Sequence, residues 1–228
     1  MQNMDASDII VIGAGGCGLM AALVAARKGV RLLLLEKTDK PGGGTAFSSK
    51  GIRAAGSRRQ RELKIDDSPE LYAQDILRRN NHESDAGIIR QLTKTSGRVA
   101  DFLTDAAGIE FQIGEFAFGH SAQRSHSWTA DKTITDFLFA AVAREKNIQV
   151  CFSTPVLSLK QDGSSAVVGV ATKEGEIAAR KIILASGGYG ASRELLSRYI
   201  PKAVDIPFPG HAGSTGDGIK MAVAIGAV

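Results

Sequence analysis

Hydrophobic positions near the N-terminus predict a strand, a helix and a second strand in close succession. Ile9 to Ile12 form a continuous β-branched run, which is typical of a parallel strand buried on both faces. Residues 16–28 are rich in Ala and Leu and meet Gly29, a pattern typical of a helix with a glycine C-cap. Apolar residues return from Val30 to Leu35. This order predicts a βαβ unit with a right-handed crossover.

The rest of the pattern predicts further helices and then a β-rich segment. Polar helices are expected over 68–80 and 85–107, then a loop over 109–130 and an amphipathic helix over 131–146. From Ile148 the period changes to two, and turn residues divide short strands at 148–153, 156–161, 167–172 and 176–180. A fully apolar strand is expected over 181–185, and an apolar helical stretch follows the glycines at 213–218. The predicted fold class is α/β: a Rossmann-like domain with a parallel sheet, a βαβ start and a small β-meander crossover.

The turn after the first strand, Gly13 to Gly18, satisfies the dinucleotide pattern GxGxxG. Its context supports this interpretation, because it follows a buried strand, opens a helix and precedes an acidic residue, Glu36, at the end of the next strand. Gly13 would allow the tight turn, Gly15 the approach of a pyrophosphate, and Gly18 close packing of helix on strand. The helix N-terminus would stabilise the phosphate charge. Glu36 would accept hydrogen bonds from the adenosine ribose, and it weighs against NADP.

A second glycine-rich loop follows at Pro41 to Ser49. Three consecutive glycines allow close approach of the backbone to a ligand. The hydroxyls of Thr45, Ser48 and Ser49 supply donors. An NAD domain normally continues into another βα unit, so this loop favours a ligand that extends well beyond ADP. A flexible surface loop without a ligand is the alternative.

Composition and charge exclude several other classes of protein. The chain has 43% hydrophobic and 23% charged residues and a net charge of +4, ordinary values for a globular protein. Its basic run from Arg53 to Lys64 lacks aromatic residues, so it indicates a solvated face, with attraction for an anionic ligand as the alternative, and no nucleic-acid site. Two cysteines and four histidines lack metal-site spacing. Cys17 is expected to be a small buried thiol, with a redox role as the alternative. Without a secretory signal or a membrane segment, the predicted location is cytoplasmic.

Four motifs in this order resemble the N-terminal part of the fumarate reductase/succinate dehydrogenase flavoprotein family, which includes ketosteroid dehydrogenases, urocanate reductases and aspartate oxidases. They are Gly13–Gly18 with Glu36-Lys37, Gly43–Gly51, Leu184–Gly190 and Thr215–Gly218. Many flavoproteins share the first motif, whereas the other three are more specific. The resemblance covers nearly the whole chain, and it implies FAD as the cofactor.

The resemblance also implies which residues contact FAD. Val156 would offer backbone contacts to the adenine. Covalent members of the family use a histidine in the glycine loop, and the matching position here is Gly44, which implies non-covalent FAD. The implied cofactor-binding residues are Gly13, Gly15, Gly16, Cys17, Gly18, Glu36, Lys37, Gly43, Gly44, Thr45, Ser48, Ser49, Gly51, Val156, Ser186, Gly187, Gly188, Asp217 and Gly218.

The reaction that the resemblance implies is hydride transfer between flavin N5 and a carbon–carbon bond beside an electron-withdrawing group. The substrate would be a small carboxylate or ketone with an adjacent C=C, and the electron donor is not specified. In the family the substrate-clamping residues follow the Gly-Asp-Gly motif. The whole chain, 1–228, is therefore expected to be the N-terminal portion of an FAD-binding domain that lacks its capping domain and closing segment.

Catalytic residues are accordingly not expected in this chain. His120, Arg124 and His126 are weak candidates in a polar loop, for which a surface position is the expected account. His211 precedes the Gly-Asp-Gly motif and receives no role. Two alternatives stay open: a non-catalytic FAD- or ADP-binding fragment, and an NAD-dependent dehydrogenase.

Overall fold

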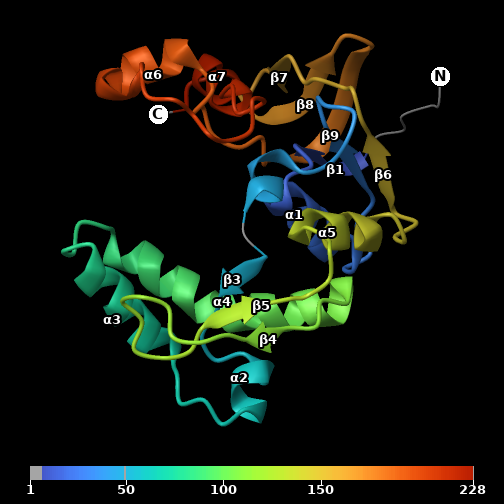
Figure 1. Ribbon diagram of the computed structural model, residues 1–228. Helices are drawn as coiled ribbons and strands as arrows, with labels where there is room; N and C mark the ends of the chain where they lie inside the picture. The colour runs from blue at the N-terminus through green and yellow to red at the C-terminus, as the bar shows by residue number, and fades with distance from the viewer. Residues whose placement is uncertain (1–6, 49, 228) are drawn as a thin grey trace. The chain divides into compact units, whose positions relative to one another are not determined.

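The computed structural model describes residues 7–48 and 50–227 (Figure 1). The chain folds into two compact units. Unit 1 comprises residues 1–48 and 133–228, and unit 2 comprises residues 49–132. Each unit is described by itself below.

A six-stranded sheet forms the centre of unit 1, with strand order β6-β2-β1-β9-β8-β7. Strands β6, β2, β1 and β9 are parallel, and β9, β8 and β7 form an antiparallel meander. Every residue of β2 is buried, as expected for a parallel strand that is covered on both faces. The predicted βαβ start is therefore confirmed. The strands are β1 Ser7–Ile12, β2 Leu32–Leu35, β6 Ile148–Cys151, β7 Ser158–Gln161, β8 Val167–Thr172 and β9 Gly175–Leu184.

Strand β9 joins the meander to the parallel sheet. Residues 175–178 pair antiparallel with β8, and residues 179–184 pair parallel with β1. The prediction of separate strands at 176–180 and 181–185 was wrong. The residue pattern changes near Lys181 because the strand pairs with β1 from Ala179 onward, and the strand continues unbroken through this point. Strand β7 begins at Ser158, so Val156 lies in the preceding connection and not in a strand.

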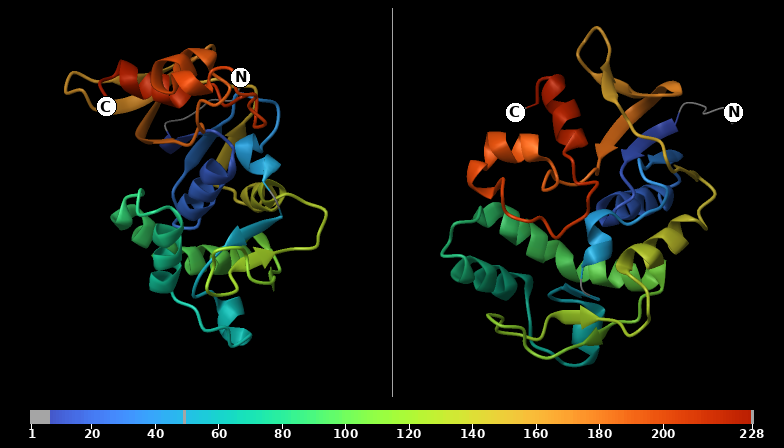
Figure 2. Two further views of the ribbon diagram at one scale, coloured as in Figure 1. Left: turned by 60° about the vertical axis from the view of Figure 1, so that its left-hand side comes forward. Right: turned by 45° about the horizontal axis from the view of Figure 1, so that its top comes forward.

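Helices α1 and α5 of unit 1 lie side by side (Figure 2). Helix α5 is shorter than the predicted 131–146, because a capping box between Thr133 and Asp136 sets its start and turns follow it from Ala143. None of the helices within the described residues has the length and apolar character needed to cross a bilayer. The helical elements of unit 1 are α1 Gly16–Ala26, α5 Ile134–Val142, α6 Arg193–Tyr199, α7 Asp217–Ala224 and the 3₁₀ turns η1 Gly43–Phe47 and η2 Pro201–Ala203.

Unit 2 combines three helices with a small antiparallel sheet of order β3-β5-β4. Helices α3 and α4 confirm the predictions over 68–80 and 85–107. The segment 109–130 was predicted as a loop, but it contains β4 and β5. These strands are two and three residues long, too short to produce an alternating pattern. The elements are α2 Arg58–Glu62, α3 Pro69–Arg79, α4 Ala86–Ala107, β3 Gly51–Arg53, β4 Gln112–Ile113 and β5 Ser125–Ser127.

Candidate functional site

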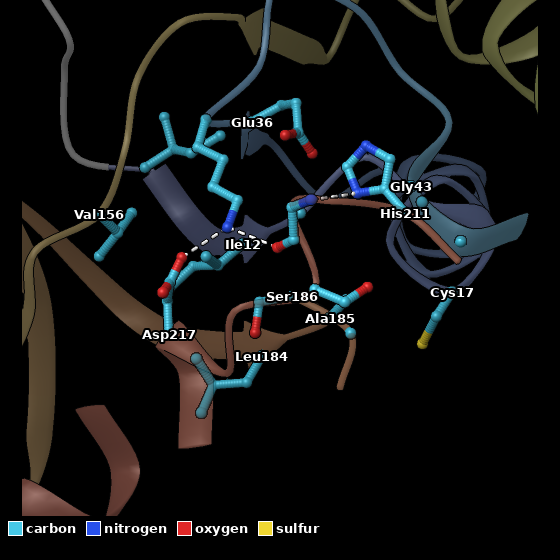
Figure 3. Close-up of a pocket in the computed structure, with 18 of the residues that line it drawn as sticks. Ile12, Cys17, Glu36, Gly43, Val156, Leu184, Ala185, Ser186, His211 and Asp217 are labelled. Carbon is cyan, nitrogen blue, oxygen red and sulfur yellow. Dashed lines mark hydrogen bonds and ion pairs between the residues drawn. The ribbon is translucent and has the colours of Figure 1, made fainter. Parts of the chain in front are cut away.

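A cavity of about 440 Å³ opens at the carboxyl ends of three parallel strands of unit 1 (Figure 3). Ile12, Leu35 and Leu184, the last residues of β1, β2 and β9, all line it. The edge at the carboxyl ends of the strands is where open α/β sheets bind their ligands. All residues that line this cavity belong to unit 1.

Most of the residues proposed from sequence for the cofactor line this cavity. Gly18 and Gly218 do not, because both are buried against neighbouring backbone or side chains. Ser48 is outside the lining, Gly51 belongs to β3 of unit 2, and Ser49 lies outside the described residues. The proposed residues that do line it are Gly13, Gly15, Gly16, Cys17, Glu36, Lys37, Gly43, Gly44, Thr45, Val156, Ser186, Gly187, Gly188 and Asp217.

The N-terminus of α1 opens into the cavity without a side-chain cap. Gly15 is the N-cap, and the first turn contains no acidic residue. The N–H of Gly16 donates to Thr45 Oγ1 at 3.2 Å. Within the described part of the chain, no hydrogen bond occupies the N–H groups of Cys17 and Gly18. A helix end with free N–H groups and no competing carboxylate fits an anion such as a diphosphate.

Two glycines of the first turn are required by contacts with the backbone. Gly13 has φ +105°, and a Cβ there would lie 2.5 Å from the carbonyl oxygen of Ala185. A Cβ at Gly18 would collide with the carbonyl oxygen of Gly13, and this contact lets α1 pack closely on the turn. The two glycines therefore position the turn and the helix, while Gly15 and Gly16 line the cavity.

Glu36 holds the glycine turn to the end of β2. Its carboxylate accepts from the N–H of Ala14 at 2.7 Å and from both the N–H and the hydroxyl of Thr38 at 2.9 Å. The residue is only 8% exposed, so these bonds replace most of its hydration. A carboxylate offers about four acceptor directions, and one therefore stays open for a further donor.

Lys37 fastens the segment 211–217 to the end of β2. Its Nζ donates to the Gly213 carbonyl at 2.6 Å, to Asp217 Oδ2 at 2.7 Å and to Thr215 Oγ1 at 2.8 Å. Burial disfavours the charged form of Asp217, but the hydrogen bonds from Lys37 and Thr215 outweigh it and lower the Asp217 pKa. An ammonium has three hydrogens, so Lys37 has none left for a ligand. Among the described lysines and arginines, only Lys37 lines the cavity.

Two further walls complete the cavity. The Ala185 N–H donates to the Ile12 carbonyl at 2.8 Å. This bond places the following segment, Ser186–Gly188, beside the end of β1. The Thr154 N–H donates to the Glu36 carbonyl at 2.9 Å and places Val156 on another side. Within the described residues, no hydrogen bond occupies the backbone N–H or carbonyl of Val156. The backbone of Val156 is therefore available to a ligand.

Sequence reasoning missed several lining residues. The strand ends Ile12, Leu35 and Leu184 could have been inferred, since ligands of such sheets bind at the carboxyl ends of strands. Ala185 lies within the Leu184–Gly190 motif but was not assigned to the site. Other missed residues come from loops and α7 and carry no recognisable sequence signal. They are Thr154, Pro155, His211, Gly213, Ser214 and Met221.

The two cysteines differ in exposure. Cys17 is exposed and lines the cavity, so the prediction of a buried thiol was wrong. Cys17 lies in the first turn of α1, which faces the open cavity, so no other described element packs over its thiol. Cys151 is half-buried, and desolvation raises its pKa, an effect that a hydrogen bond from Gln149 partly offsets.

Arg124 and His126 lie in the interior of unit 2, which corrects the expectation of a surface loop. Arg124 is 1% exposed and pairs with the buried carboxylates of Asp67 and Asp75. His126 is fully buried, with Nδ1 bonded to the Arg124 carbonyl at 2.9 Å and Nε2 to Ser57 Oγ at 2.7 Å. Its burial lowers the pKa of the imidazole.

His120 is the third of the weak candidates. Burial and the charge of Arg124 lower its pKa. Its Nδ1 lies 3.2 Å from an Arg124 nitrogen, so the ring belongs to the edge of the same buried network. None of these three residues lines the cavity of unit 1, and the described residues contain no cluster suited to a metal ion.

Comparison with known proteins gives consistent matches along the chain. Urocanate reductase from Eggerthella lenta is 34% identical over 96% of this chain and 38% of that protein. NADH:fumarate oxidoreductase from Klebsiella pneumoniae is 29% identical over 96% of this chain and 24% of that protein. The open conformation of a flavocytochrome c3 fumarate reductase superposes with a TM-score of 0.89 at 27% identity, covering 98% of this chain and 41% of that one. The chain thus spans well under half the length of these proteins.

A family model supports the same relationship. The model described as FAD binding domain matches residues 8–228, from β1 to the end of the chain. The uncapped helix end and the glycine walls of the cavity fit this cofactor. The chain therefore belongs to the FAD binding domain family.

Proposed function

We propose that the cavity of unit 1 holds FAD non-covalently, with its diphosphate at the N-terminus of α1. The observation that carries this proposal is the open helix end: Cys17 lines a glycine-rich cavity, and no hydrogen bond within the described residues occupies the N–H groups of Cys17 and Gly18. The helix dipole and these donors would stabilise the diphosphate charge. Residues 1–228 would form part of one FAD-binding domain.

The adenosine half of the cofactor would lie toward Glu36 and Val156. The open acceptor direction of the Glu36 carboxylate suits a ribose hydroxyl, and the unused backbone groups of Val156 suit the adenine edge. The glycine segments at 43–44 and 187–188 would allow close approach of the remainder of FAD. Gly44, which matches the histidine of covalent family members, offers no side chain for a bond.

The domain would serve an oxidoreductase that transfers hydride between flavin N5 and a carbon–carbon bond activated by a carboxylate or carbonyl. The names of the relatives support this reaction class, since urocanate and fumarate each carry a C=C beside a carboxylate. Bound FAD would supply the hydride chemistry, and the residues of this chain would orient it and exclude water from it. Substrate-binding groups would come from outside the cavity described above.

Titration with FAD tests the binding proposal. We expect the purified chain to bind FAD with a shifted flavin absorbance and to release all of the flavin into the supernatant after acid precipitation. NADH titrated in parallel should bind far more weakly, because the open loops suit a longer ligand. Failure to bind FAD, or flavin that stays with the acid precipitate, would contradict the corresponding part of the proposal.

Alkylation of Cys17 gives a second test. We expect N-ethylmaleimide to label Cys17 well ahead of Cys151, because Cys17 is exposed while burial raises the pKa of Cys151. Saturating FAD should slow the labelling of Cys17 at least about tenfold, since the thiol lines the proposed site. Mass spectrometry of the labelled peptides measures both rates, with Cys17→Ser as the control for site assignment. Equal labelling with and without FAD would place the cofactor elsewhere.

A turnover assay of the FAD-loaded chain distinguishes catalysis from cofactor binding alone. With reduced dye as donor, an FAD-loaded chain that hydrogenates an alkene carboxylate would exclude a purely cofactor-binding role. Binding without turnover would show that the chemistry requires residues beyond this domain.

A further inference from the structure

We infer that His211 donates a hydrogen bond from Nε2 to the diphosphate of the bound cofactor, an inference that rests on the proposed FAD site. His211 lines the cavity from the segment 211–217. Its imidazole is a polar group of the cavity that the proposed contacts with FAD leave unused.

Its hydrogen-bonding state follows from a contact within its own loop. The N–H of Gly213 donates to Nδ1 of His211 at 3.1 Å. A ring nitrogen that accepts a hydrogen bond carries no hydrogen, so the neutral ring carries its proton on Nε2. Across the described residues, Nε2 has no hydrogen-bond partner, and it is therefore a donor available to a ligand.

The ring is also held in position by two neighbours. A Cβ at Gly213 would collide with the imidazole, so the ring packs directly over this glycine. Lys37 holds the same glycine through its carbonyl at 2.6 Å. The ring also packs against Phe47 in an edge-type arrangement, with 6.0 Å between centroids. A donor fixed in this way loses little side-chain freedom on binding a ligand.

The neighbours of His211 point to the diphosphate. Phe47 belongs to η1, and Thr45 of the same turn accepts the hydrogen bond from Gly16 at the N-terminus of α1. Figure 3 places the ring beside Gly43 of this turn, on the opposite side of the view from Val156. His211 thus belongs to the wall next to the helix end. Since the hydrogens of Lys37 are all committed, Nε2–H would be the side-chain donor that supplements the free N–H groups of α1.

Two substitutions of His211 distinguish the proposed donor at Nε2 from the hydrogen bond that Nδ1 accepts from Gly213. Asparagine at 211 can keep an oxygen near the position of Nδ1 for the Gly213 N–H but removes the donor at Nε2. Glutamine at 211 can place an amide N–H near the position of Nε2 but removes the acceptor for Gly213. We expect His211→Asn to weaken binding of both FAD and ADP by about tenfold or more, as for a hydrogen bond to a charged group. We expect His211→Gln to weaken both by less than about threefold.

The dissociation constants come from FAD titration and from displacement of FAD by ADP. His82→Asn, which removes an exposed histidine of unit 2, is the control and should leave both constants unchanged. The inference is overturned if His211→Asn binds ADP as tightly as the unmodified chain, or if His211→Gln is the weaker binder of the two. Failure of the unmodified chain to bind FAD would instead reject the proposed function.

Discussion

Replacing Arg124 with methionine should destabilise unit 2 by about 3–5 kcal/mol, because it leaves the buried carboxylate of Asp67 without its cation and that of Asp75 with only the exposed Arg78. Arg124 donates two hydrogen bonds to Asp67 Oδ1 and one to Oδ2, at 2.7–3.1 Å, and another to Asp75. The side chains of Asp67 and Asp75 are 0% and 3% exposed. Fluorescence of Trp128, the single tryptophan of the chain and a buried residue of unit 2, measures the unfolding of this unit in urea.

The matched control is Arg78→Met. Arg78 pairs with the same carboxylate, Asp75, at 2.7 Å, but its side chain is 70% exposed. Loss of this exposed pair should cost about 1 kcal/mol or less. If the two variants lose equal stability, burial of the Arg124 pair is not the source of the effect.

The stability that the Arg124–Asp75 pair contributes should depend on pH. Burial raises the pKa of Asp75, but hydrogen bonds from Arg124 and Ser121 outweigh it and lower the pKa to about 2. The pair therefore stabilises the unmodified chain above pH 4, and this contribution is lost as the pH falls toward 2. In Arg124→Met the carboxylates can protonate in the folded state, so the deficit relative to the unmodified chain should shrink between pH 7 and pH 4. A deficit that is constant over this range would contradict the assignment.

Replacing Gly18 with alanine should have the largest effect on unit 1. The new methyl group would collide with the Gly13 carbonyl, so α1 must move away from the turn that it opens. Overpacking of this kind costs about 3 kcal/mol at the upper end, which would lower Tm by roughly 6–12 °C. Displacement of the helix N-terminus should also weaken FAD binding by at least about tenfold. Circular dichroism on heating and FAD titration measure the two effects.

Gly163→Ala is the corresponding control. A Cβ at Gly163 meets nothing within 4 Å, and its backbone does not have the positive φ that disfavours alanine. This variant should match the unmodified chain in Tm and in FAD affinity. A Gly18→Ala variant that behaves like it would show that the close contact relaxes without cost.

The local elements of unit 1 were predictable because strands buried on both faces of a parallel sheet consist of continuous apolar residues. The apolar runs of β1 and β2 and the glycine turn between them were sufficient for the βαβ start and for the helix end at the cavity. Helices α3 and α4 were predictable from their residue pattern, and the structure shows Ser68 and Asp85 as their N-caps.

Features that depend on contacts between distant residues were not predictable. Arg124 and His126 are polar, so a surface loop was the expected account, yet Asp67, Asp75 and Ser57 satisfy them in the interior. The lining role of His211 depends on the fold of a loop that carries no periodic pattern. The continuity of β9 likewise depends on the pairing partners that it changes along its length.

Lys37 donates all three of its hydrogens to protein acceptors, so among the described residues the cavity has no free ammonium to attract its ligand. A free ammonium would attract any anion over about a Debye length, whereas the field of a helix end fades within its first turn. The cavity itself is therefore expected to exert little long-range attraction on phosphates in solution. Discrimination among ligands would occur at contact, through the match between the ligand and the glycine walls.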